Sequence, residues 1–192
     1  MLAKEKEFNY TPEQYLALEE QAIDKNEYRQ GQIFAMESAT LNHNRIAGNI
    51  CFAMRRRLAG KGCETFIGDV RLSIDRKKMY TYPDVMVVCG EPKFVEERND
   101  TIVNPKVVLE VLSKSTAAYD RSDKFQAYWS LESFEEYVLI DQYRVHVEYF
   151  RRQSGKMWEL NVFTNIEDVL SLKSIEAEIP LREIYQNVVW DG

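Results

Sequence analysis

The stretch Val107-Val108-Leu109-Glu110-Val111-Leu112 places a single carboxylate inside an otherwise apolar run. A second stretch, Tyr82-Pro83-Asp84-Val85-Met86-Val87-Val88, has the same character, with Asp84 as its carboxylate. Apolar runs of this length that are bounded by polar segments are typical of buried strands. Both stretches are therefore predicted to be strands in the core of a sheet.

The two carboxylates suggest one shared site. A carboxylate in an apolar run is costly unless it is paired, hydrogen-bonded or bound to a metal. Hard divalent cations bind clustered oxygen atoms, and phosphate-ester hydrolysis uses such a cation to activate water. The alternative is that Asp84 and Glu110 each lie at a strand end and pair with a basic residue at the surface.

The rest of the chain alternates between helical and extended patterns. Thr11, Pro12 and Gln14 form a capping box and predict a helix over 11–23, and Gly31 predicts a turn in a hairpin over 27–36. A longer helix is predicted over 41–58, with a buried stripe at every fourth residue. Further strands are expected at 70–74, 136–140, 145–150, 157–163 and 170–172, and further helices at 120–131 and after Pro180. This order predicts one α/β domain over residues 1–192, with a mixed central sheet flanked by helices.

Composition excludes several classes of protein. The apolar fraction of 45% indicates a globular chain, and no apolar run approaches the roughly 18–20 residues of a membrane span. Lys and Glu alternate at positions 4–7, so no secretory signal is expected and a cytoplasmic location is predicted. The net charge of −6 counts mildly against a nucleic-acid partner, although acidic residues around a metal would also lower it.

The three cysteines are predicted to be buried free thiols. Cys51, Cys63 and Cys89 lie far apart in apolar stretches, and none belongs to a C-x-x-C pair. The only histidines are His43 and His146, which excludes a histidine-based metal cluster. No glycine-rich nucleotide-binding motif and no serine-hydrolase elbow occurs, so no nucleotide cofactor is expected.

An ordered set of motifs resembles the Uma-two family of restriction endonucleases, within the PD-(D/E)xK nuclease superfamily. The set comprises Pro83-Asp84, then Glu110-Val111-Leu112-Ser113-Lys114-Ser115-Thr116, then Asp120, Lys124 and Tyr128, together with 27–31, His43 and 136–141. The resemblance extends over roughly residues 10–184. It implies a restriction-endonuclease-like fold and hydrolysis of phosphodiester bonds in DNA.

The resemblance also implies a metal site. Asp84 and Glu110 would bind Mg²⁺ (or Mn²⁺), with the backbone carbonyl of Val111 as a further ligand. The superfamily has a lysine two residues after the glutamate, but position 112 of this chain is Leu. The family pattern nominates Lys124 on the following helix instead, and a long lysine side chain can reach the site from there.

Other interpretations of the lysines remain open. Asp120 and Lys124 have the spacing of an ordinary ion pair on an exposed helix face. Lys114 is the second candidate for the catalytic lysine.

The remaining candidate residues carry weaker signals. Glu27 occupies the position, shortly before a turn glycine, at which the family has an acid. It is a candidate catalytic residue that could reach the metal as an outer ligand. His43 is a candidate for positioning substrate or water, or alternatively a capping residue. Asp69 is either a ligand or a turn residue, and His146 is expected to face outward from a strand. The run 55–57, three arginines on one helix, is interpreted as a solvated helix face, because consecutive residues point in different directions.

Three classes of function therefore remain. The first is a nuclease, for which cleavage of both strands of a duplex needs two active sites and favours a homodimer. The second is a nuclease-fold module that binds nucleic acid without cutting it, which Leu112 and the net charge support. The third is a protein-interaction partner with no affinity for metals.

Overall fold

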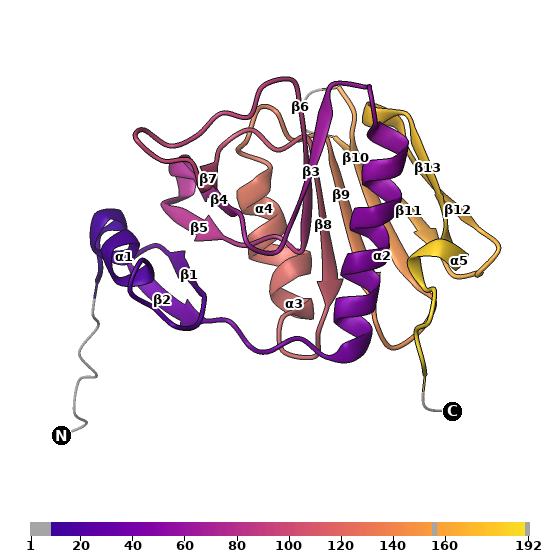
Figure 1. The fold of residues 1–192 in the computed structure, drawn as a ribbon, viewed down its shortest axis with the longest axis horizontal. Coiled ribbons are helices and arrows are strands. Elements are labelled where there is room, and N and C mark those ends of the chain that lie inside the picture. Colours follow the sequence, from indigo (N-terminus) through magenta and orange to yellow (C-terminus); the bar gives the residue numbers. More distant parts are fainter. Residues whose placement is uncertain (1–8, 155–156, 191–192) are drawn as a thin grey trace.

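The computed structural model describes residues 9–154 and 157–190, and its centre is a six-stranded sheet (Figure 1). The strand order is β11-β10-β9-β8-β6-β3, and every pairing is antiparallel except that of β8 with β9. The sheet is therefore mixed, as predicted. Its strands are β3 (Cys63–Ile67), β6 (Val85–Cys89), β8 (Val107–Leu112), β9 (Glu136–Asp141), β10 (Val147–Arg152) and β11 (Trp158–Phe163).

The long helix α2 (Leu41–Leu58) covers one face of this sheet and has the predicted bounds. Thr40 caps it by accepting a hydrogen bond from the His43 backbone N–H. The predicted stripe of Ile46, Ile50, Met54 and Leu58 is fully buried. It packs in one core cluster with the sheet, with the hairpin of β12 (Val169–Leu172) and β13 (Ala177–Pro180), and with α5 (Leu181–Ile184).

An aromatic cluster and a single helical segment cover the opposite face. The segment consists of α3 (Ala117–Tyr119), a π-helical turn (Asp120–Lys124) and α4 (Phe125–Tyr128). It begins three residues before the predicted helix and ends three residues earlier. Phe125 packs against Tyr137 and Phe150 of the sheet at ring-centroid distances of 4.8 and 4.7 Å.

A second, five-stranded sheet lies beside the first, where the sequence analysis predicted only one. Its order is β2-β1-β5-β4-β7, formed by β1 (Asn26–Arg29), β2 (Gln32–Ala35), β4 (Arg71–Ile74), β5 (Met79–Thr81) and β7 (Thr101–Ile102). The predicted hairpin is its β1–β2 pair, and Gly31 has a φ of 96° at the turn. Helix α1 (Pro12–Glu19), which has the predicted capping box, packs Tyr15 against Tyr28 and Tyr80 of this sheet. It ends four residues before the predicted boundary.

Only the second part of the predicted strand over 82–88 forms a strand, β6, and residues 82–84 connect the two sheets. β5 ends at Thr81 and β6 starts at Val85, so the chain crosses from one sheet to the other at Tyr82-Pro83-Asp84. Pro83 has no backbone N–H to donate to a ladder, which explains the break. Asp84 therefore lies at the point where the six-stranded sheet begins.

The predicted strand over 70–74 is present as Arg71–Ile74 and is buried along its whole length, and Arg71 donates to the Tyr82 hydroxyl at 2.9 Å inside the protein. The sequence analysis also missed β3, β5, β7 and β13, each of which is short or lacks a strong alternating pattern.

The prediction of three free thiols was wrong for two of the cysteines. Cys63 on β3 and Cys89 on β6 face each other in the antiparallel register and form a disulfide. Cys51 is the buried free cysteine. The sequence could not reveal the pairing, because it depends on β3 lying next to β6.

Among the described residues, no helix has both the length and the apolar character needed to cross a membrane.

Candidate active site

Asp84 and Glu110 lie opposite each other at the junction of β6 and β8. Val85 pairs with Leu109, and extending this antiparallel register by one residue aligns Asp84 with Glu110. Each carboxylate accepts a hydrogen bond from the backbone beside the other acid. The Val111 N–H donates to Asp84 Oδ2 at 2.7 Å, and the Asp84 N–H donates to Glu110 Oε2 at 3.3 Å. The strand pairing itself therefore fixes the separation of the two carboxylates.

Strand alternation directs Glu110 toward the helical segment. Val108 and Leu112, two residues to either side, pack in the aromatic cluster on that face, whereas Leu109 and Val111 pack in the cluster beneath α2. Leu112, which stands where the superfamily has its lysine, is thus an apolar core residue.

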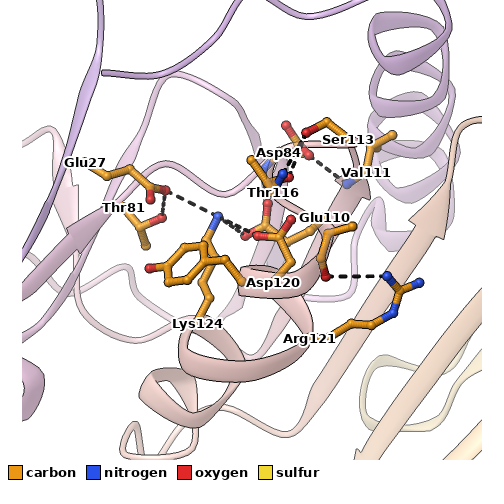
Figure 2. Close-up of polar contacts among 12 residues, drawn as sticks. Glu27, Thr81, Asp84, Glu110, Val111, Ser113, Thr116, Asp120, Arg121 and Lys124 are labelled. Carbon is orange, nitrogen blue, oxygen red and sulfur yellow. Dashed lines mark hydrogen bonds and ion pairs between the residues drawn. The ribbon is translucent and has the colours of Figure 1, made fainter. Parts of the chain in front are cut away.

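Lys124 contacts three carboxylates (Figure 2). Its Nζ lies 2.9 Å from Glu110 Oε1, 3.3 Å from Glu27 Oε1 and 3.5 Å from Asp120 Oδ1. The side chain is only 7% exposed, so this is no pair on a solvated helix face. Burial alone would lower the pKa of Lys124, but the charges of Glu110, Glu27 and Asp120 outweigh it and raise the pKa well above its usual value. Lys124 is therefore a protonated ammonium, suited to electrostatic stabilisation rather than to proton abstraction.

Glu27 reaches the site from the second sheet. It lies on β1, is buried, and accepts a hydrogen bond from Thr81 at the end of β5. Figure 2 shows Glu27 and Glu110 approaching Lys124 from different elements. The site is therefore assembled where the two sheets and the helical segment meet.

The acids around Lys124 are strongly desolvated. Burial raises the pKa of Glu110 to about 8, although the Lys124 ammonium opposes this shift. The Tyr128 hydroxyl donates to Glu110 Oε1 at 2.9 Å. Burial also raises the pKa of Asp120, whose buried Oδ1 accepts no hydrogen bond from the described residues and has the Lys124 ammonium at 3.5 Å as its ion-pair partner. Buried, incompletely satisfied carboxylates of this kind have a free-energy cost that a bound cation would relieve.

His43 lies beside both Asp84 and Val111. Its Nε2 is 3.3 Å from Asp84 Oδ2. Burial would lower the pKa of His43, but the hydrogen bond and the charge of Asp84, with a contribution from the Val111 backbone, raise it. The imidazole at the start of α2 thus holds the Asp84 carboxylate in place.

The structure places the other candidates apart from this cluster. Asp69 is exposed and pairs with Lys25 at 2.8 Å, as a turn residue would. Lys114 is exposed, with its ammonium 5.5 Å from the centre of the Tyr143 ring. His146 pairs with Glu148 at 3.2 Å. Of the three consecutive arginines, Arg55 contacts the Thr65 carbonyl, and Arg56 and Arg57 pair with Glu183.

Three further residues complete the cluster, and the sequence analysis gave none of them a role in the site, although Asp120 and Tyr128 belong to its motif set. Asp120 and Tyr128 lie four residues before and after Lys124, a spacing that marks one side of a helix. Thr81 had no signal, because its contact with Glu27 depends on the pairing of β1 with β5.

The residues present fit a site for a small, hard cation. In the described parts of the chain, no three side chains of His, Cys, Asp or Glu gather closely enough to hold a metal by themselves. Mg²⁺ does not require such a cage, since it binds through one or two carboxylates and keeps several waters. No described residue donates a hydrogen bond or forms an ion pair with Asp84 Oδ1, which leaves that oxygen free for a cation.

Comparison with known proteins identifies sequence relatives and a solved structure with the same fold. Two uncharacterized proteins of Synechocystis sp. are similar: sll1609 is 38% identical over 150 residues, covering 78% of this chain and 85% of that protein, and slr1290 is 34% identical over 182 residues, covering 94% and 93%. A crystal structure described as a "putative nuclease belonging to DUF820" from Anabaena variabilis matches with a TM-score of 0.74 and 16% identity. The match covers 94% of this chain and 99% of the other, and it supports the restriction-endonuclease-like fold.

The profile of the Uma2 family, described as "Putative restriction endonuclease", matches residues 12–182. This match spans both sheets, the helical segment and every residue of the cluster around Lys124. The chain therefore belongs to the Uma2 family.

Proposed function

We propose that this protein is a Mg²⁺-dependent endonuclease that hydrolyses phosphodiester bonds in DNA. The observation that carries the proposal is the direct contact of the Lys124 ammonium with Glu110, which is itself paired across two strands with Asp84. An ammonium held beside two neighbouring carboxylates is the arrangement of side chains expected for metal-assisted hydrolysis of a phosphate ester.

Asp84, Glu110 and the Val111 carbonyl would hold Mg²⁺ or Mn²⁺. When bound, the cation would activate a water molecule and stabilise the developing charge on the phosphate. Lys124 is positioned to bind the attacking water or a phosphate oxygen while it remains protonated. Glu27 and Asp120 hold the ammonium in place, and His43 orients Asp84.

The first experiment measures Mg²⁺ and Mn²⁺ binding by calorimetry. Asp84→Ala and Glu110→Ala are compared with the wild type, and Asp69→Ala serves as a control because that acid is exposed and lies apart from the cluster. We expect binding to be lost in the first two variants and retained in the control. Equal binding by all four proteins would show that the metal is held elsewhere.

The second experiment measures cleavage of duplex DNA, single-stranded DNA and RNA with each metal. We expect cleavage of DNA by the wild type and none by Glu110→Ala. If DNA and RNA both remain intact while nucleic acid still binds, the protein is a binding module that has kept the fold without the activity.

The same proposal sets expectations for the cell and for assembly. We expect a cytoplasmic enzyme, and a homodimer if it cuts both strands of a duplex. Sedimentation of the wild type with and without duplex DNA would test the assembly.

A further inference from the structure

Arg29 differs from the other arginines of this chain in its hydrogen bonding. Each of the others donates to a carboxylate, an amide oxygen, a hydroxyl or a backbone carbonyl. For Arg29 no such partner exists among the described residues, and its Nε is buried without a hydrogen bond. Because an unsatisfied buried donor costs free energy, such a group calls for a water, an ion or a ligand.

Aromatic rings hold the guanidinium of Arg29 in a fixed position. Its Cζ lies 3.8 Å from the centre of the Phe34 ring on β2 and 3.9 Å from that of the Tyr119 ring on α3. Stacking of this kind uses the faces of the guanidinium and leaves the N–H donors in its plane free. Arg29, Phe34 and Tyr119 are all partly exposed, so a ligand can reach the group from solvent.

The position of Arg29 ties it to the candidate active site. Arg29 and Glu27 lie two residues apart on β1, so their side chains share one face of the strand. Glu27 points to Lys124 on that face. The Tyr119 ring that stacks on Arg29 also lies 6.0 Å from Lys124 Nζ, and Tyr119 immediately precedes Asp120.

The negative charge of the site explains why a phosphate backbone would need the positive charge of Arg29. Asp84, Glu110, Asp120 and Glu27 face a single lysine and one histidine, and the whole chain carries a net charge of −6. A nucleic-acid backbone that approaches these acids needs compensating positive charge beyond the metal. A planar guanidinium with free donors matches two oxygens of one phosphate.

We infer that Arg29 binds a backbone phosphate of the nucleic-acid substrate, adjacent to the phosphate that is cut. This inference rests on the proposed function. The β1–β2 hairpin then forms the side of the site that binds the substrate. Phe34 and Tyr119 hold the arginine in position before the substrate binds.

The test is the salt dependence of DNA binding. Fluorescence anisotropy of a labelled DNA duplex, with Ca²⁺ in place of Mg²⁺, is measured at several salt concentrations for the wild type, Arg29→Gln and Arg29→Lys. Arg56→Gln is the matched control, because Arg56 also lies over an aromatic ring, that of Phe52, but on the outer side of α2. Thermal denaturation of each variant checks that the fold is retained.

We expect Arg29→Gln to weaken binding about tenfold and to reduce the slope of log K against log salt by about 1. Arg29→Lys should restore the slope and only part of the affinity, since an ammonium lacks the planar fork. Arg56→Gln should match the wild type. If Arg29→Gln does not fold, Arg29→Lys decides by itself: affinity equal to that of the wild type would refute the phosphate contact.

Two results would overturn the inference alone. Either Arg29→Gln binds like the wild type, or it binds more weakly with an unchanged salt slope, which would make Arg29 a packing residue. A wild type that neither binds nor cuts nucleic acid would instead overturn the proposed function and this inference together.

Discussion

Lys124 is the residue on which the chemistry of the site depends. Its ammonium is buried and shared among Glu27, Glu110 and Asp120, which would otherwise repel one another. The same ammonium competes with any metal ion for the oxygens of Glu110. Affinity for metal and catalytic rate should therefore respond in opposite directions when Lys124 is replaced.

Lys124→Met tests this expectation. We expect the rate of DNA cleavage to fall roughly 100- to 1,000-fold, as when one preorganised donor is removed from an active site. Mg²⁺ affinity measured by calorimetry should rise, because Glu110 loses its competing cation. Lys114→Met is the control, since Lys114 is exposed. An unchanged cleavage rate in Lys124→Met would show that another group positions the water or phosphate.

At the scale of elements, a buried carboxylate fastens the C-terminal hairpin to the main sheet. Glu136, at the start of β9, is fully buried and accepts hydrogen bonds from the Tyr149 hydroxyl at 2.5 Å and from the Ser174 N–H and hydroxyl at 3.0 and 2.9 Å. Ser174 lies in the turn between β12 and β13. One residue thus joins three elements.

Glu136→Ala should lower the free energy of unfolding by roughly 2–4 kcal/mol, because it leaves several buried donors unsatisfied. Glu135→Ala is the matched control, because Glu135 is the adjacent residue and its carboxylate is 44% exposed and pairs with Lys106. An exposed pair of that kind contributes at most about 1 kcal/mol. Urea denaturation measures both changes, and equal losses in the two variants would contradict the anchoring role.

The disulfide between Cys63 and Cys89 fastens the edge strand β3 to β6. It closes a loop across a sequence separation of 26, at the end of β6 opposite to Asp84. A loop of this length predicts a stabilisation of roughly 2–4 kcal/mol in the oxidised protein. In a reducing cytoplasm the two residues would be thiols and this contribution would be absent.

Dithiothreitol should therefore lower the Tm of the oxidised wild type and leave that of the Cys63→Ser/Cys89→Ser variant unchanged. Mg²⁺ binding by the double variant should equal that of the wild type, because Asp84 lies at the other end of the strand. A loss of Mg²⁺ binding on reduction would show that the disulfide supports the site.

At the scale of the whole molecule, the acidic charge opposes binding to DNA. A net charge of −6 repels the phosphate backbone, and the candidate site places several largely buried carboxylates close to where the substrate would lie. A divalent cation bound at Asp84 and Glu110 would reverse the local charge where the substrate lies.

Removing the metal with EDTA should therefore weaken DNA binding at least about tenfold, and Ca²⁺ should restore it. Anisotropy measured at a fixed salt concentration provides the comparison. Asp84→Ala/Glu110→Ala is the control, and its binding should not respond to EDTA. Equal affinity of the wild type with and without metal would place the DNA on a different surface.

The sequence by itself determined the elements that depend on local pattern. Continuous apolar runs identified β6 and β8, and the four-residue stripe identified helix α2 and its buried face. Two carboxylates interrupting those runs pointed to one site, because each would be too costly alone in the core. The strand and helix predictions succeeded because periodicity is a property of neighbouring residues, and the structure brings the two carboxylates together at the junction of β6 and β8.

Only the tertiary structure decided which elements meet. Glu27 contacts Lys124 across about half of the chain, and Cys63 pairs with Cys89 because β3 lies beside β6. The spacing of Asp120 and Lys124 fits an exposed pair as well as a buried one, and the approach of β1 and β8 to the π-helical turn selected the buried arrangement. Sequence spacing fixes distances within one element, whereas packing between elements sets the environment of each charge.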